Sequence, residues 1–327
     1  MKYEPHDYQK YAIAFIESHP VSAILLDMGL GKTSITLTAI NDLLFDSFLV
    51  HKVLIIAHLR VARTTWTAEV DKWNHLQNLI CSVAMGTESE RRNALLKRAD
   101  IYIINRENIG WLVEESGVLF DYDMIVIDEL SSFKNHKAKR FKSLMKVRPT
   151  VNRIVGLTGT PAGNGLMDLW AEFRLLDMGQ RLGRFISRYR DKFFIPDKRN
   201  GQIVYSYKPL PNAEKAIYEA ISDITISMKA ADHLNMPELI STDYLVDMDD
   251  KEREIYERFK KNLVIELSSD KELTASNAAT LSGKLSQMAN GAVYDEAGEC
   301  CRIHDRKMDA LEDLIESANG KPVLVAY

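Results

Sequence analysis

The chain has 327 residues, 46% hydrophobic and 27% charged, so it is long enough for about two packed domains and too apolar to be disordered. Its net charge of −4 excludes a protein that is basic throughout. Lys and Arg number 12, 16 and 14 in residues 1–129, 130–200 and 201–327, against 18, 5 and 23 Asp and Glu. The middle segment, with a net charge of +11, is therefore the part expected to attract a polyanion.

Cysteine usage and hydropathy point to a cytoplasmic protein. The three cysteines, Cys81, Cys300 and Cys301, are too sparse for a disulfide framework. No window approaches the roughly 18 apolar residues of a membrane span, and the N-terminus lacks a signal core, so we expect no membrane partner. Cys300, Cys301 and His304 could be part of a metal site, but a solvated loop is the better interpretation without a second ligand cluster.

Five apolar runs of strand length occur in the first half of the chain, at residues 21–26, 53–57, 101–104, 124–127 and 153–157. They are continuous rather than alternating, which predicts strands buried on both faces, as in a parallel sheet. Amphipathic stretches between them predict helices at residues 33–44, 61–73 and 88–97. This alternation is typical of an α/β fold with a doubly wound parallel sheet.

The pattern changes after residue 178. Residues 181–192 are basic and aromatic, residues 203–207 predict a short strand, and helices are predicted at 213–224, 250–267 and 273–290. A last helix at 308–318 is followed by an apolar run at 323–327. We expect this run to be the first strand of a further domain, so that the chain is a fragment. The alternative is that it completes the first sheet.

The first motif with chemistry follows the first predicted strand. Residues 27–33 (DMGLGKT) open the predicted helix at 33–44, and glycines in such a loop let backbone N–H groups face phosphate oxygens. The usual pattern has a glycine where Leu26 stands. The loop predicts a nucleotide site formed by Gly29, Leu30, Gly31, Lys32, Thr33 and Ser34.

Two acids end the fourth apolar run. In a phosphoryl-transfer site, Lys32 would reach the β- and γ-phosphates, and Asp128 would bind Mg²⁺ together with the Thr33 hydroxyl. Glu129 would orient or deprotonate the attacking water. We therefore predict that Lys32, Asp128 and Glu129 are the catalytic residues.

Small polar residues end the fifth run, at Thr158, Gly159 and Thr160. Their hydroxyls could sense the nucleotide and couple its state to motion. Because the carboxyl ends of parallel strands meet at one edge of a sheet, we expect these residues to lie beside the phosphate loop.

Together these motifs resemble superfamily 2 helicases, and among them the Swi/Snf-type ATPases of compact bacterial or phage type. Residues 27–33 are similar to the family's phosphate loop, 128–135 (DELSSFKN) to its D-E-x-H-x-x-K-N box, and 157–161 (LTGTP) to its L-T-G-T-P motif. Tyr8 and Gln9 resemble the Q motif, whose glutamine binds adenine. The resemblance implies ATP and Mg²⁺ as cofactors.

The same resemblance implies three parts. Residues 1–178 would be an N-terminal RecA-like P-loop NTPase lobe, 179–300 a mostly helical insertion, and 301–327 a linker helix with the first strand of a truncated second lobe. It implies an ATP-dependent helicase or translocase on DNA that is poorly active without the second lobe. The implied location is the cytoplasm of a bacterium or of a phage-infected host.

Two departures from the family pattern affect the motor reading. Leu130 and Ser131 replace an Ala-His pair, although Ser131 could still hydrogen-bond toward residues 157–161. Met228 and Lys229 replace an Arg pair of many relatives.

For nucleic acid, the resemblance places motif Ia at His58 and Arg60 and motif Ib at Asn105 and Arg106. The basic stretch adds Lys134, Lys137, Arg140 and further cations up to Arg148 and Arg153. A second basic patch lies at 181–192, interleaved with Phe185, Tyr189, Phe193 and Phe194. Such surfaces bind phosphates with strong salt dependence, and their alternative is a solvated helix face. We expect Trp66 and Trp73 to be core residues rather than base-stacking platforms.

Three functions remain open from the sequence. The first is an ATP-driven motor on DNA, with duplex DNA favoured over single strands and RNA less expected. The second is a nucleotide-gated DNA-binding module without motor activity, which Leu26 and Ser131 would support. The third, a different P-loop enzyme such as a small-molecule kinase, leaves residues 157–161 and the basic stretch unexplained.

Overall fold

In the computed structural model the chain divides into two compact units, Met1–Pro237 and Glu238–Tyr327. The structure describes all residues except 161–162, 164, 201–202, 235–240, 263, 269–270, 275–277, 296–297, 319 and 327. No described helix is long and apolar enough to cross a membrane.

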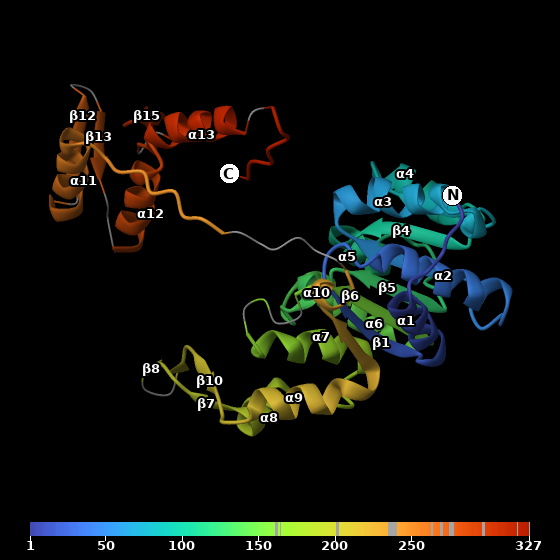
Figure 1. The fold of residues 1–327 in the computed structure, drawn as a ribbon. Coiled ribbons are helices and arrows are strands. Elements are labelled where there is room, and N and C mark those ends of the chain that lie inside the picture. The colour runs from blue at the N-terminus through green and yellow to red at the C-terminus, as the bar shows by residue number, and fades with distance from the viewer. Residues whose placement is uncertain are drawn as a thin grey trace. The chain divides into compact units, whose positions relative to one another are not determined.

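A seven-stranded parallel sheet forms the centre of the first unit (Figure 1). Its strands in chain order are β1 (Val21–Leu26), β2 (Val53–Ala57), β3 (Cys81–Ala84), β4 (Ile101–Asn105), β5 (Met124–Asp128), β6 (Arg153–Thr158) and β11 (Thr225–Met228). Their order in the sheet is β11-β1-β6-β5-β2-β4-β3. The five predicted strands and the α/β class are confirmed, whereas β3 and β11 were not predicted.

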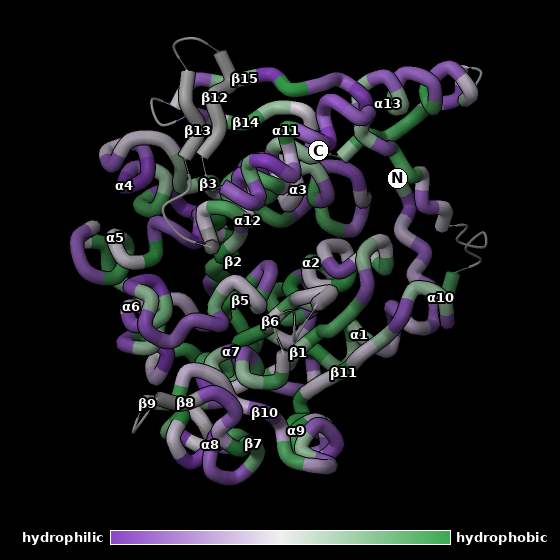
Figure 2. The backbone as a smooth tube through the Cα atoms, turned by 90° about the vertical axis from the view of Figure 1, so that its left-hand side faces the viewer, coloured by the Kyte–Doolittle hydropathy of each residue, from purple (hydrophilic) through white to green (hydrophobic). Residues whose placement is uncertain are grey.

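Helices cover both faces of this sheet. On one face, α1 (Asp7–Ser18), α2 (Lys32–Phe45) and α3 (Leu59–Lys72) contribute to one apolar core. On the other, α4 (Glu88–Leu96), α5 (Ile109–Glu114), α6 (Lys139–Val147) and α7 (Met167–Asp177) contribute to a second. The predicted doubly wound arrangement is confirmed. Figure 2 shows the central strands as hydrophobic, with hydrophilic stretches along α6 and α8.

The segment from the end of α7 to Pro237 also belongs to the first unit. They form α8 (Ile186–Phe193), the short strands β7 (Phe194–Pro196), β8 (Arg199–Asn200), β9 (Ile203–Val204) and β10 (Tyr207–Pro209), then α9 (Ala213–Ile221) and α10 (Ala230–His233). Side chains of α8 and α9 join the same core as α7, and β11 pairs with β1. The compact unit therefore extends well past the boundary predicted at residue 178. The predicted strand at 203–207 is split between β9 and β10.

The second unit consists of α11 (Asp250–Asn262), β12 (Val264–Ser268), β13 (Lys271–Thr274), α12 (Ala278–Ala289), β14 (Ala292–Tyr294), β15 (Cys300–Arg302) and α13 (Arg306–Ser317). Its small core contains Phe259, Met288, Val293 and Cys301. The helices predicted at 250–267 and 273–290 were too long, because β12 and β13 pair as an antiparallel hairpin between them.

The last described residues have no regular secondary structure. Residues 320–326 form neither helix nor strand, and Leu324 is 98% exposed. An apolar run becomes a buried strand only where neighbouring strands pair with it, and no described strand pairs with this one. The alternative prediction, that this run completes the first sheet, is therefore wrong for the described residues 323–326, because the edge strands of that sheet are β11 and β3. That the run begins a further domain stays a prediction.

Candidate nucleotide and nucleic-acid site

The loop between β1 and α2 has the backbone that the predicted phosphate loop needs. Gly29 and Gly31 have φ angles of 84° and 78°, in the left-handed region, and Gly31 is the N-cap of α2. A Cβ at Gly31 would lie 2.7 Å from Nε2 of Gln9 and 3.0 Å from Oγ of Ser34. Glycine is therefore required by both the turn and the close approach of α1, and the N-terminus of a 14-residue helix points from this loop.

Lys32 is the charged group of this loop. Its Nζ donates hydrogen bonds to the carbonyl oxygens of Leu26 at 2.7 Å and of Asp27 at 3.2 Å. Burial lowers the pKa of Lys32, while the nearby carboxylates of Glu129, Asp128 and Asp27 raise it. A half-buried ammonium held by neutral carbonyls can transfer its hydrogen bonds to an anionic phosphate in the loop.

Asp128 lies at the carboxyl end of β5, on the edge that β1 and β6 share. Its Oδ2 accepts a hydrogen bond of 2.9 Å from Nε1 of Trp66, a fully buried residue of α3. Burial raises the pKa of Asp128, and the bond from Trp66 opposes that shift. Trp66 is thus a core residue, as predicted, whose indole N–H also contacts the predicted metal carboxylate.

Glu129 adopts a left-handed conformation with φ of 66°. Its Oε1 accepts hydrogen bonds from Oγ1 of Thr158, at 2.6 Å, and from Oγ of Ser131. The proposed coupling motif and the proposed base are therefore in direct contact. The sequence allowed a hydrogen bond from Ser131 toward residues 157–161. In the structure its hydroxyl bonds to Glu129 instead, because the 3₁₀ turn Leu130–Phe133 brings it back to that carboxylate.

The other two coupling residues follow Thr158. The backbone N–H of Thr160 donates to Oγ1 of Thr158 at 3.1 Å. A Cβ at Gly159 would lie 3.3 Å from the carbonyl oxygen of Leu26 and 3.7 Å from Nζ of Lys32. The motif therefore lies directly against the phosphate loop. Pro161, the last residue of this motif, lies outside the described residues.

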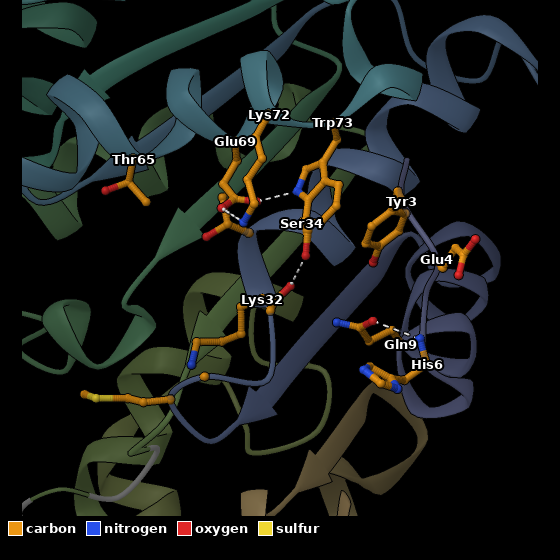
Figure 3. A pocket seen from close by; sticks show the side chains of 14 residues that line it. Tyr3, Glu4, His6, Gln9, Lys32, Ser34, Thr65, Glu69, Lys72 and Trp73 are labelled. Carbon is orange, nitrogen blue, oxygen red and sulfur yellow. Dashed lines mark hydrogen bonds and ion pairs between the residues drawn. The ribbon is translucent and has the colours of Figure 1, made fainter. Parts of the chain in front are cut away.

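A cavity of about 550 Å³ extends from the phosphate loop to the N-terminal segment (Figure 3). It is lined by Gly29, Gly31, Lys32, Thr33 and Ser34 of the predicted set, and by Gln9. Oε1 of Gln9 accepts from the backbone N–H of His6 at 3.0 Å, and its Nε2 donates to the carbonyl oxygen of Leu30 at 3.3 Å. Leu30 is fully buried and does not line the cavity.

The sequence missed the far wall of this cavity. Figure 3 shows Glu69, Lys72 and Trp73 projecting from the end of α3, opposite Gln9. Tyr3 packs edge-on against Trp73, with ring centroids 5.0 Å apart. Trp73 is only partly buried, so the prediction that it is a core residue holds only in part. No local pattern marks these residues, because the cavity joins helix ends distant in sequence.

The residues present fit a nucleoside triphosphate with a divalent metal ion. The loop glycines leave room for phosphate oxygens, and Lys32 supplies a positive charge. Thr33 and Asp128 offer the hard oxygen ligands that Mg²⁺ prefers, with the remaining positions left to phosphate and water. By contrast, in the described part of the chain no three His, Cys, Asp or Glu side chains are arranged to hold a metal by themselves, so Cys300, Cys301 and His304 form no such site.

A buried acid close to this site was also missed. Glu172 of α7 is 0% exposed, and neither carboxylate oxygen has a hydrogen-bond partner among the described residues. Burial raises its pKa to about 9, with further raising by Asp168 and Glu129 and lowering by Lys134. The sequence around Glu172 does not distinguish a buried glutamate from an exposed one.

The predicted motif Ia residues lie at the start of α3. His58 is its N-cap, and an open groove of about 560 Å³ is lined by His58, Leu59, Arg60, Val61, Arg63 and Thr64. Both arginines of this groove are exposed. The predicted motif Ib residues, Asn105 and Arg106, follow β4, and Arg106 pairs with Glu107 at 3.2 Å.

Much of the first basic patch is engaged within the protein. Arg140 pairs with Glu107 at 3.0 Å, and Lys134 lies 3.7 Å from Asp168, whereas Lys137 is exposed. Other ion pairs of this patch join Lys139 to Glu115 at 3.0 Å and Lys146 to Glu114 at 2.8 Å.

Two residues predicted to belong to that surface patch do not lie on the surface. Arg148 and Arg153 are buried, and their guanidinium groups donate to backbone carbonyl oxygens, including those of Leu176 and Ile16. They are structural residues rather than surface residues, because five donors in a planar fork can satisfy several carbonyls at helix ends.

The second basic patch is also only partly available to a ligand. Arg181 pairs with Asp177 and Asp223, while Tyr189, Phe193 and Phe194 are buried in the core, as the alternative interpretation required. Only Phe185, at 60% exposed, remains an accessible aromatic of the four, beside the exposed Arg184 and Arg188.

The sheet order and its phosphate loop define the class of the first unit, a RecA-like α/β fold. The chain belongs to the SNF2-related domain family, whose model matches residues 8–293. The resemblance to Swi/Snf-type superfamily 2 ATPases is thereby confirmed. Members of this family are ATPases, so ATP binding is the general expectation for the loop.

Relatives from distant organisms share this domain. Protein p41 of Acyrthosiphon pisum secondary endosymbiont phage 1 is 37% identical over 99% of this chain and 72% of its own length. The TATA-binding protein-associated factor mot1 of Schizosaccharomyces pombe is 27% identical over 79% of this chain, which spans 14% of that protein. The Sulfolobus solfataricus SWI2/SNF2 ATPase core, solved in complex with dsDNA, matches with a TM-score of 0.59 and 22% identity, over 98% of this chain and 65% of that chain.

Proposed function

We propose that this chain is the ATP-binding part of a DNA translocase that couples ATP hydrolysis to movement along duplex DNA. The observation that carries the proposal is the convergence of Lys32, Asp128, Glu129 and Thr158 at the carboxyl ends of β1, β5 and β6. Membership of the SNF2-related family supports the motor, and the dsDNA complex of the Sulfolobus relative supports duplex DNA as the track.

Each proposed residue has a separate task. Lys32 leaves its two loop carbonyls and donates to the β- and γ-phosphates. Thr33 and Asp128 hold Mg²⁺, which neutralises phosphate charge when it is bound. Glu129 accepts the proton of the attacking water, and the hydroxyl of Thr158 holds that carboxylate in place. Gln9 contacts adenine on the α1 side of the cavity.

DNA binding is assigned to the strand ends nearby. His58 and Arg60 at the start of α3, Asn105 and Arg106 after β4, and the basic residues Lys134, Lys137 and Arg140 form the proposed set. Their contacts would be to phosphates, so binding should weaken steeply with salt and depend little on sequence.

The isolated chain should hydrolyse ATP slowly. In phosphoryl transfer an arginine from a second element often stabilises the transition state, and its contribution is about 10³–10⁵-fold. We propose that a second lobe supplies such a residue. A location in the cytoplasm of a bacterium or an infected host agrees with three free cysteines.

The test is an ATPase assay on this chain and on the longest natural form of the protein, with and without duplex DNA. We expect stimulation by DNA in the longer form and its loss in Lys32→Ala and Glu129→Gln, with unchanged circular dichroism. Lys215→Ala, at an exposed position of α9 outside the proposed sites, is the matched control. An ATPase that ignores DNA in every form would refute the motor, and absent hydrolysis with retained nucleotide binding would favour the nucleotide-gated module.

Strand separation is a separate question. A triplex-displacement assay beside a strand-displacement assay distinguishes movement along the duplex from unwinding. We expect displacement of the third strand only, because no unwinding element is evident from the sequence.

A further inference from the structure

Helix α3 contacts three functional features that lie far apart in the sequence. Its first residues line the groove that contains the exposed Arg60 and Arg63. Its middle residue Trp66 donates to Asp128 at 2.9 Å. Its last turns line the nucleotide cavity through Glu69 and Lys72.

The hydrogen bond between Trp66 and Asp128 is held in place by the packing of the core. Trp66 is 0% exposed within the core between α3 and the sheet, so packing restricts its ring to one orientation. The bond occupies Oδ2 of Asp128 and leaves Oδ1 without that restraint. A carboxylate fixed through one oxygen presents the other in a single direction, which is what a metal ligand requires.

The groove and the metal carboxylate are connected by less than two turns of helix. Arg63 precedes Trp66 by three residues, which is nearly one turn, and Arg60 precedes it by six. A displacement of the arginines by a bound phosphate backbone would therefore reach the indole through one continuous helix. No loop intervenes that could absorb the displacement.

We propose that Trp66 is a positioning residue that orients Asp128 for the metal ion and couples occupancy of the α3 groove by duplex DNA phosphates to that carboxylate. The proposal rests on the proposed function, since it assigns a regulator to the same ATP site. It differs from the motif-based assignment because Trp66 is buried and lines neither the nucleotide cavity nor the α3 groove.

The test removes the N–H without removing the ring. Benzothienylalanine at position 66 replaces the indole N–H by sulfur and keeps the bicyclic shape, and Trp66→Phe is the simpler second variant. Trp111→Phe is the matched control, since Trp111 is a buried tryptophan of α5 outside the site.

The first measurement is equilibrium binding of a fluorescent, non-hydrolysable ATP analogue as Mg²⁺ is titrated. We expect both position-66 variants to need about three- to tenfold more Mg²⁺ for half-saturation, with unchanged affinity when Mg²⁺ is absent. Trp111→Phe should match the unsubstituted protein. A Mg²⁺ midpoint that is unchanged in the benzothienylalanine protein would overturn the positioning role.

The second measurement addresses coupling. Duplex DNA added to the unsubstituted protein should lower the Mg²⁺ midpoint, and this shift should be lost in the position-66 variants and in Arg60→Ala/Arg63→Ala. A DNA-induced shift that persists without the indole N–H would refute the coupling. If the unsubstituted protein binds no nucleotide at all, the proposed function fails instead, so the two failures are distinguishable.

Discussion

Glu172 offers a quantitative test of the packing beneath the site. In the folded protein its pKa is raised to about 9 by burial, against 4.5 for an unperturbed glutamate, so it is protonated at neutral pH. The unfolded chain releases that proton above pH 4.5. The stability contributed by protonation is therefore complete below about pH 4.5 and is lost as the pH rises toward 9.

The magnitude follows from this linkage. Between the two pKa values, each pH unit lowers the free energy of unfolding by about 1.4 kcal/mol through this one group. Glu172→Gln removes the titration and keeps the shape. Relative to that variant, the unsubstituted protein should lose about 3 kcal/mol between pH 6 and pH 8. Comparing the two pH values cancels any constant effect of the amide.

Urea denaturation followed by tryptophan fluorescence measures this difference. All four tryptophans lie before residue 238, so the signal reports on the first unit alone. Glu219→Gln, at an exposed position of α9, is the control and should give parallel pH profiles. Profiles of Glu172→Gln that run parallel to the unsubstituted protein from pH 6 to pH 8 would show that the carboxyl is ionised in the fold, against the reasoning.

Three further predictions concern single contacts. Gln9→Ala should reduce the preference for ATP over GTP in competition binding, because its amide lines the cavity and is the proposed adenine contact. Thr158→Val should lower kcat about tenfold with unchanged nucleotide affinity, because it removes the hydroxyl that holds Glu129. Arg148→Met should cost about 3 kcal/mol in urea denaturation, because buried carbonyl oxygens lose their donor; a cost below 1 kcal/mol would contradict this.

The interior strands were predictable because they are buried on both faces. β1, β2, β4, β5 and β6 are continuous apolar runs, and each lies between two strands of the sheet. The strands that were missed, β3 and β11, lie at its edges. Both are four residues long. β3 alternates partly exposed with buried side chains, and β11 buries only Ile226, so neither pattern can be distinguished from a loop.

The phosphate loop and the strand-end acids were predictable for a topological reason. Parallel strands bring their carboxyl ends to one edge, so residues 27–33, 128–129 and 158–160 had to meet. The partners that orient them were not predictable. Trp66 and Ser131 contact the two acids only because α3 and the turn Leu130–Phe133 pack as they do, and these directions are set by tertiary contacts.

The net charge of +11 in residues 130–200 overstates the surface available to DNA. Arg148 and Arg153 are buried and donate to backbone carbonyl oxygens. Three further cations pair with glutamates of the acidic first segment: Lys139, Arg140 and Lys146. The positive charge of the middle segment and the negative charge of the first segment thus partly neutralise each other where α6 packs against α5 and the turn before α5. Conversely, the exposed Arg60 and Arg63 belong to the segment with net negative charge. A phosphate backbone responds to charge at a place on the surface, and therefore the start of α3 is a stronger candidate for DNA contact than the most basic stretch of sequence.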